Sequence, residues 1–121
     1  MFDHVGLEVS DLARSARFYD AVFFPIGTRR MFESERALAY GVNDARFWIT
    51  ERGRDADAAW GHVAFETSGK VAVDAAYEAG LKAGGRSDGP PGPRPQYGPR
   101  YYAAYLLDPD GHRVEVVSGG H

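Results

Sequence analysis

The stretch Gly61-His62-Val63-Ala64-Phe65-Glu66-Thr67-Ser68 repeats, almost residue for residue, the opening stretch His4-Val5-Gly6-Leu7-Glu8-Val9-Ser10. The same spacing carries Tyr19 onto Tyr77 and Gly27 onto Gly85. A repeat with a period of about half the chain indicates a duplicated module rather than a solenoid. We therefore expect one domain over residues 1–121, with module one at 1–52, a polar linker at 53–60 and module two at 61–121.

Both repeated stretches alternate as strands do. In each, the histidine lies on the same face as a glutamate, while the apolar residues take the other face and should meet a helix. The polar faces then point towards the space that the two modules enclose, and a pseudo-twofold axis between the modules would bring His4 and His62 towards each other. A single such histidine is more often a structural residue, but two at equivalent repeat positions favour a ligand role.

The first half has the pattern strand, helix and three strands. Ser10 or Asp11 can cap a helix that Pro25 and Gly27 end, and strand-like runs follow at 28–32, 37–42 and 46–50. The second half repeats this order with a strand at 61–67, a helix for which Ser68 is a possible cap, and strands at 101–107 and 112–118. Residues 84–99 are mostly Gly and Pro, which predicts a semi-rigid loop without regular structure, either functional or merely solvated.

Composition narrows the classes of partner and compartment. The chain has no cysteine, which excludes disulfides and thiolate sites and leaves any metal to His, Asp and Glu. A formal net charge of −3 gives no electrostatic footprint for nucleic acid. No apolar run reaches the length of a membrane span and no signal peptide is visible, so we expect a cytoplasmic protein without a membrane partner.

The last predicted strand adds a carboxylate. Glu115 leaves the apolar side of its strand as the two histidines leave theirs. Two histidines and a carboxylate on three strands facing one cavity can hold Fe(II), Mn(II) or Zn(II) and leave other coordination positions open. The alternative is that Glu115 forms an ion pair with Arg113 or with an arginine between the modules.

These residues resemble a known family. The His-Val strand, the Ser10-Asp11-Leu12 helix start with Phe18-Tyr19, the central Gly-His-Val and the terminal Asp108-Pro109-Asp110-Gly111 turn followed by Glu115 resemble the vicinal oxygen chelate superfamily. That superfamily includes glyoxalase I, extradiol dioxygenases, fosfomycin-modifying transferases and bleomycin-resistance proteins. The resemblance covers essentially the whole chain and is nearest to small glyoxalase-like proteins.

The resemblance implies an α+β fold in which two βαβββ modules form an incomplete mixed β-barrel around a metal-binding cavity, with the helices outside. It places His4, His62 and Glu115 at the ligand positions for a divalent metal ion, Fe, Mn, Zn or Ni. Glyoxalase I has a fourth ligand on the fourth strand, and the matched hairpins put Trp48 there. The chain is therefore not expected to be glyoxalase I itself.

Several other residues are candidates for the site. Extradiol dioxygenases carry a tyrosine ten residues before the glutamate, which Tyr105 matches, and its hydroxyl is a candidate catalytic hydrogen-bond donor or weak acid, or else part of the cavity wall. Tyr101 shares its face. Trp48 would shape an apolar substrate pocket, and Arg100 would bind a substrate carboxylate or simply be solvated. We expect His112 and His121 not to be ligands.

Two functions follow from these residues. The first is a metal-dependent enzyme that acts on a small oxygen-rich substrate by isomerase, lyase or oxygenase chemistry. The alternative is a binding protein of the bleomycin-resistance type, which sequesters a small molecule without turnover. In either case we expect a homodimer, since two small modules leave sheet edges to cover and the resemblance implies modules that are paired and sometimes exchanged between chains.

Overall fold

A computed structural model describes residues 1–58 and 60–120. Ala59 of the expected linker and His121 lie outside the described residues. Module one contains β1 (Val5–Val9), α1 (Leu12–Phe23), a short 3-10 helix η1 (Phe24–Ile26), β2 (Arg29–Glu33), β3 (Ala37–Gly41) and β4 (Phe47–Glu51). Module two contains β5 (His62–Glu66), α2 (Lys70–Lys82), β6 (Arg86–Pro93), β7 (Tyr102–Leu107) and β8 (Arg113–Ser118). The predicted α+β fold of two βαβββ modules is confirmed.

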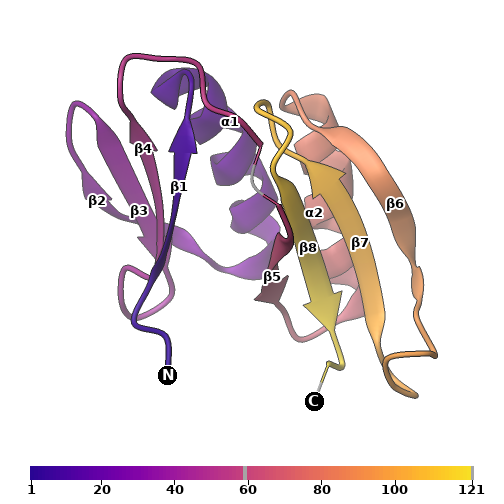
Figure 1. Ribbon diagram of the computed structural model, residues 1–121. Coiled ribbons are helices and arrows are strands. Elements are labelled where there is room, and N and C mark those ends of the chain that lie inside the picture. Colours follow the sequence, from indigo (N-terminus) through magenta and orange to yellow (C-terminus); the bar gives the residue numbers. More distant parts are fainter. Residues whose placement is uncertain (59, 121) are drawn as a thin grey trace.

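Each module forms its own mixed four-stranded sheet, with strand orders β1-β4-β3-β2 and β5-β8-β7-β6. The two sheets stand side by side with both helices behind them, and they do not close into a full barrel (Figure 1). The parallel pairs have matching registers, in which Gly6 lies opposite Trp48 and Ala64 lies opposite Glu115. Trp48 is therefore the module-one counterpart of Glu115, as the sequence predicted.

The helix ends follow local chemistry. The Asp11 carboxylate caps α1 by accepting a hydrogen bond from the backbone N–H of Arg14. Gly27, at a φ of 77°, ends the 3-10 turn that follows, a left-handed conformation that glycine adopts without strain. The predicted Ser68 cap on α2 was wrong, because the helix begins one residue later and its N-cap is Gly69, in extended conformation and without a side-chain hydrogen bond.

The Gly/Pro-rich segment corrects a second expectation. Residues 84–99 were predicted to lack regular structure, but Arg86–Pro93 forms β6 at the outer edge of the second sheet (Figure 1). Its pairing with β7 is interrupted by register shifts on both sides of Gly89. Prolines lack an N–H and are confined to edges and bulges of sheets, so an irregular edge strand is where this composition can still pair.

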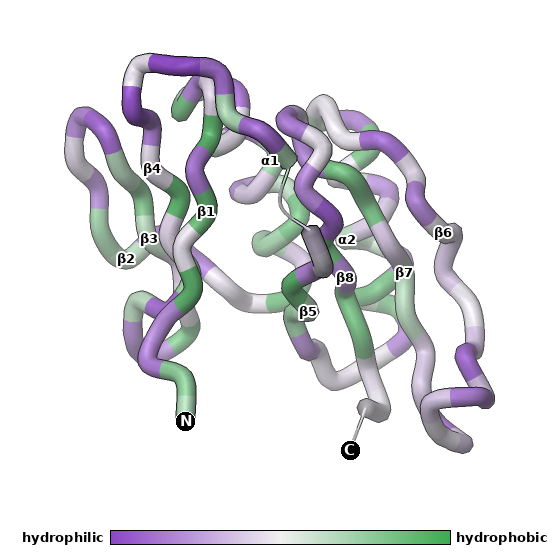
Figure 2. The backbone as a smooth tube through the Cα atoms, viewed as in Figure 1, coloured by the Kyte–Doolittle hydropathy of each residue, from purple (hydrophilic) through white to green (hydrophobic). Residues whose placement is uncertain are grey.

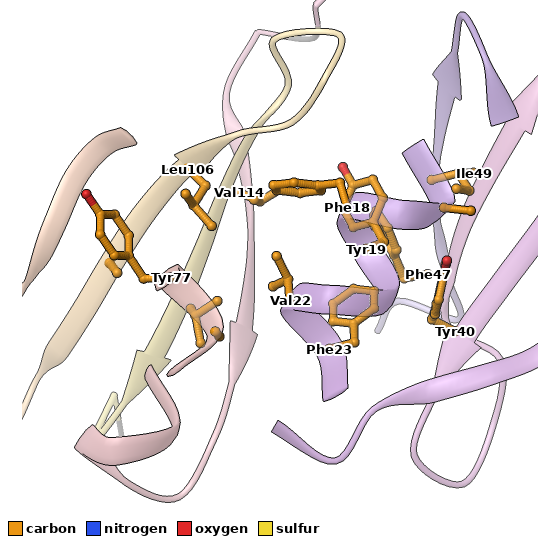
Figure 3. Close-up of a cluster of buried hydrophobic side chains, with 14 of the residues drawn as sticks. Phe18, Tyr19, Val22, Phe23, Tyr40, Phe47, Ile49, Tyr77, Leu106 and Val114 are labelled. Carbon is orange, nitrogen blue, oxygen red and sulfur yellow. The ribbon is translucent and has the colours of Figure 1, made fainter. Parts of the chain in front are cut away.

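One hydrophobic core joins the modules. Side chains of α1 lie between the two sheets, with Tyr19 and Phe23 towards Phe47 of module one and Phe18 towards Val114 of module two (Figure 3). The Phe23 ring also contacts Phe65 of β5, with ring centroids 4.8 Å apart. The modules are therefore held together through helix packing and this shared core.

The close approach of the two helices depends on a glycine of α2. A Cβ on Gly80 would lie 2.9 Å from Val22 of α1 and 2.7 Å from Leu106 of β7. A side chain here would force Val22 or Leu106 to move within a close-packed core, so this position favours glycine.

The sheet faces opposite the helices are called here the open faces, because neither helix covers them (Figure 1). The segment that leads from β4 towards β5 crosses the top of the molecule and is mostly hydrophilic (Figure 2). It is held against module one by Arg54, whose guanidinium donates two 2.8 Å hydrogen bonds to Glu8. No helix in the described part of the chain is long and apolar enough to cross a membrane.

Candidate metal and substrate site

Glu115 lies at the centre of the open face of module two. It sits on β8 opposite Ala64 of β5 and Tyr105 of β7, and it is only 1% exposed. Its Oε1 lies 3.1 Å from Nε2 of His62, and its Oε2 accepts a 2.5 Å hydrogen bond from the hydroxyl of Tyr101. The alternative pairing with Arg113 is not adopted, because that guanidinium donates to Asp88 instead.

The two tyrosines beside Glu115 stay protonated at neutral pH. Burial and the hydrogen bond to Glu115 raise the pKa of Tyr101 well above its ordinary value. Burial, followed by the charge of Glu115, raises the pKa of Tyr105 as well. The ring of Tyr105 lies against His62, with centroids 6.4 Å apart. Both hydroxyls are therefore hydrogen-bond donors rather than bases.

His4 and Trp48 lie on the open face of module one. The His4 side chain is 57% exposed, with Nδ1 2.8 Å from Asp3 and its ring edge-on to Trp48. Within the described chain, the ligand atoms of His4, His62 and Glu115 do not all come within 4.8 Å of one another. Because the last two are only 3.1 Å apart, it is His4 that lies away from the pair.

The pair that does meet fits a metal ion. Nitrogen and oxygen ligands lie about 2.0–2.2 Å from zinc, and neighbouring ligand atoms at that radius are separated by about 3 Å. The 3.1 Å between Nε2 of His62 and Oε1 of Glu115 has this size. The second carboxylate oxygen is oriented by Tyr101, as outer hydrogen bonds commonly orient metal ligands. Module two thus offers two of the three predicted ligands at a suitable spacing.

The structure does not group Arg100 with these residues. Arg100 is exposed, and its backbone lies against Gly119. The arginine beside Tyr105 is Arg94, with its guanidinium 5.4 Å from the ring centroid. Sequence reasoning passed over Arg94 because it lies within the segment interpreted as a loop. A strand prediction for 86–93 would have placed its backbone beside Tyr101, where it donates a 2.8 Å hydrogen bond to the Tyr101 oxygen.

A second group of potential ligands consists of Asp108, Asp110 and His112 in the β7–β8 turn. Its atoms already serve a hydrogen-bond network. Asp108 accepts from the buried hydroxyl of Tyr19 at 2.6 Å and from the backbone N–H groups of Asp110 and His112. Asp110 accepts from the N–H of Ser10 and from the Arg14 side chain of module one. We call this group the turn clasp, because it fastens the hairpin of module two to module one.

His112 belongs to the same clasp. It is 2% exposed, and its Nε2 lies 2.8 Å from the backbone oxygen of Glu8 on β1. This hydrogen bond gives the buried His112 a structural role, and His112 does not lie on the open faces with the predicted ligands.

Comparison with known proteins identifies the family. Residues 1–116 match the model of the Glyoxalase/Bleomycin resistance protein/Dioxygenase superfamily, and the chain belongs to that superfamily. No match was found among the curated proteins.

Several solved structures share the fold. A glyoxalase/bleomycin resistance protein from Albidiferax ferrireducens T118 is 31% identical, with 98% of each chain covered and a TM-score of 0.86. A glyoxalase-related enzyme from Fulvimarina pelagi is 23% identical over 98% of this chain and 88% of that one, with a TM-score of 0.78. A mutant of the fosfomycin resistance protein FosX from Listeria monocytogenes, complexed with Mn(II) and a dihydroxypropylphosphonic acid, is 22% identical over 98% and 90% of the chains, with a TM-score of 0.71.

Proposed function

We propose that this protein is a divalent-metal-dependent enzyme that acts on a small oxygen-rich molecule. The observation that carries the proposal is the 3.1 Å approach of His62 to a buried Glu115 whose other oxygen is fixed by Tyr101. A buried carboxylate costs free energy unless its charge is paired, and a metal ion held together with His62 would pair it.

Each residue has a distinct task in this proposal. His62 and Glu115 would hold the metal from module two, and His4 would complete the set. A divalent cation held there would supply Lewis-acid stabilisation of negative charge that develops on substrate oxygens. Tyr105, kept protonated by its raised pKa, would donate its O–H to a substrate oxygen. Trp48 and Tyr101 would bound the space in which the substrate lies.

We further propose that the site is shared between two chains of a homodimer. Within one chain His4 lies away from His62 and Glu115, although all three lie on open faces. A second copy placed face to face, with its module one against module two of the first, would supply the missing histidine. The two-fold symmetry of a dimer would then create two equivalent sites.

The reaction we favour is an isomerisation, lyase or oxygenase step other than that of glyoxalase I. Glyoxalase I has a metal ligand at the position that Trp48 occupies here, and the indole of Trp48 offers only an N–H donor. Glu51, the nearest acid along β4, is committed elsewhere, because its Oε1 accepts the backbone N–H of Leu12 at 2.8 Å.

The direct test is metal content. Untagged protein purified from cells should contain one divalent metal per chain, and Mn(II) is the first ion to add back, given the fold it shares with FosX. His4→Ala, His62→Ala and Glu115→Ala should each lose stoichiometric metal. Full retention by the His62→Ala and Glu115→Ala proteins would refute the proposed site.

A non-catalytic binding protein is the second candidate. The open face of module one carries Phe32 and Trp48 with ring centroids 5.2 Å apart, and Phe32 is 44% exposed. Such an accessible aromatic pair suits the capture of a flat organic molecule. Tight binding of aromatic ligands by protein that takes up no metal would favour this function over the enzyme.

A further inference from the structure

Arg94 differs from the other arginines near the open face of module two in what its guanidinium contacts. Its guanidinium donates to two backbone oxygens, at 2.8 Å to Pro90 and 3.3 Å to Pro93, and lies over the ring of Tyr105. None of the carboxylates in the described residues forms an ion pair with it. Carbonyls and an aromatic face orient the cation but leave its charge unneutralised.

The chain holds Arg94 in place from both sides. Its backbone N–H donates to Tyr101 O at 2.8 Å, and its own oxygen accepts from the N–H of Tyr97 at 3.0 Å. The ring of Tyr97 in turn lies 5.3 Å from the ring of Tyr101. The turn between β6 and β7 therefore fixes the backbone of Arg94, and the contacts of its guanidinium orient the side chain, so less side-chain freedom is lost when a ligand binds.

The side chains that line the pocket beside Arg94 carry a net positive charge. Arg94, Arg113, Asp88 and Tyr105 all line a pocket of about 220 Å³. Asp88 is bonded to Arg113 at 2.7 Å, so these two charges offset each other and the charge of Arg94 remains. A pocket of this size is smaller than those that hold whole drug-sized ligands, and it suits a single functional group.

Tyr105 lies between this pocket and the proposed metal site. Tyr105 contacts Arg94 on one side and the ring of His62 on the other. A guanidinium has five N–H donors in a planar fork, and the two carbonyls occupy two of them. The remaining donors match the paired oxygens of a carboxylate, phosphonate or phosphate.

We infer that Arg94 binds an oxyanion group of the substrate, so that the substrate is an acid carrying a carboxylate, phosphonate or phosphate one aromatic ring away from the metal. This inference rests on the proposed function for the position of the reacting centre. It makes Arg94, rather than Arg100, the residue that selects anionic substrates.

The test uses small probes and calorimetry on the full-length protein, both metal-free and loaded with Mn(II). Acetate and methylphosphonate represent the two kinds of oxyanion, and acetamide is the neutral control. The anions should bind and acetamide should not. Arg94→Gln should weaken anion binding by roughly 10- to 100-fold, the range expected when a charged hydrogen-bond donor is lost. Arg94→Lys should be intermediate, because an ammonium keeps the charge without the fork.

Arg86→Gln is the matched control, since Arg86 lies on the same strand but is exposed and outside the pocket-lining set. It should bind the anions as the unmodified protein does. Equal binding by Arg94→Gln and unmodified protein, or no anion binding at all, would overturn the inference. Circular dichroism establishes that each variant is folded.

Metal content measured on the same samples separates the two proposals. Arg94-dependent anion binding by protein that takes up no metal would leave this inference standing while the metal proposal failed. Full metal content together with anion binding that does not depend on Arg94 would overturn this inference and leave the metal proposal standing.

Discussion

Glu115 has to be satisfied by its neighbours, because burial removes the water that an exposed carboxylate would use. His62 and Tyr101 are those neighbours. Of the two, only Tyr101 can be changed without removing a proposed ligand, which makes its hydroxyl a sensitive probe of the site.

Tyr101→Phe should weaken metal binding by about tenfold, the lower end of what the loss of an orienting hydrogen bond costs a metal site. Affinity is measured by competition with a chelating dye. Tyr102→Phe is the control, because it deletes a hydroxyl that bonds Asp74 at 2.7 Å. Unchanged affinity in Tyr101→Phe would mean that the hydroxyl does not orient a ligand.

Trp48 provides the second residue-scale prediction. Protein loaded with nickel or zinc should isomerise the glutathione hemithioacetal of methylglyoxal poorly, since absence of a positioned acid or base typically costs about 10²- to 10⁴-fold in rate. Trp48→Glu places a carboxylate opposite Gly6 in module one, at the position that corresponds to Glu115 opposite Ala64 in module two. Activity that rises in this variant supports the assignment, while rapid turnover by the unmodified protein would contradict it.

At the scale of single elements, the β7–β8 turn depends on one buried acid. Asp108→Ala would leave the Tyr19 hydroxyl and two backbone N–H groups without their acceptor. We expect it to cost about 3 kcal/mol or more of unfolding free energy, because each buried unsatisfied group costs about 1–3 kcal/mol. Asp108→Asn keeps an oxygen for the N–H groups and should cost much less. Urea denaturation of both variants makes the comparison, and equal losses would show that the acceptor oxygen is unimportant.

The same acid gives a pH dependence with a definite sign. Burial raises the pKa of Asp108 above its usual 3.8, so the native state binds this proton more tightly than the unfolded state. The contribution of Asp108 to stability is therefore greatest below its unfolded pKa and declines as pH rises through the raised value. The unfolding free energy of the unmodified protein, relative to that of Asp108→Asn, should therefore increase as the pH is lowered from 7 to 4. A difference that stays constant with pH would contradict this.

Much of this architecture could be predicted from alternation and turns. The two repeated strands, the capped first helix and the counterpart relation of Trp48 and Glu115 all follow from residue pattern, which records local backbone preference and burial. His62 begins its strand as predicted, whereas His4 lies one residue before β1. Strand β6 could not be predicted, because Pro90, Pro91 and Pro93 oppose a strand and only pairing with β7 overrides them. The separation of His4 from His62 also escaped prediction, since it depends on helix packing between the modules.

On the scale of the whole molecule, the proposed shared site makes a prediction by complementation. In a heterodimer of His4→Ala and His62→Ala chains, one site would combine both changes and the other would be intact. Equimolar mixing after reversible dissociation should restore about a quarter of the full metal content, because random pairing makes half the dimers mixed. Neither variant alone should bind. No recovery in a mixture that light scattering shows to be dimeric would place each site within one chain, and a monomeric mass would remove the basis for sharing.

The prolines of β6 also decide how copies of this chain can meet. A sheet grows when the free edge of one strand donates and accepts hydrogen bonds with another chain, and such edges are where proteins aggregate. Along Arg86–Pro93 three of the residues have no N–H to offer, and the pairing register is broken on both sides of Gly89. Additional strands therefore find no continuous ladder at this outer border of module two. The glycine and proline content of β6 therefore prevents further strands from adding at this edge and protects the protein from growing into fibres.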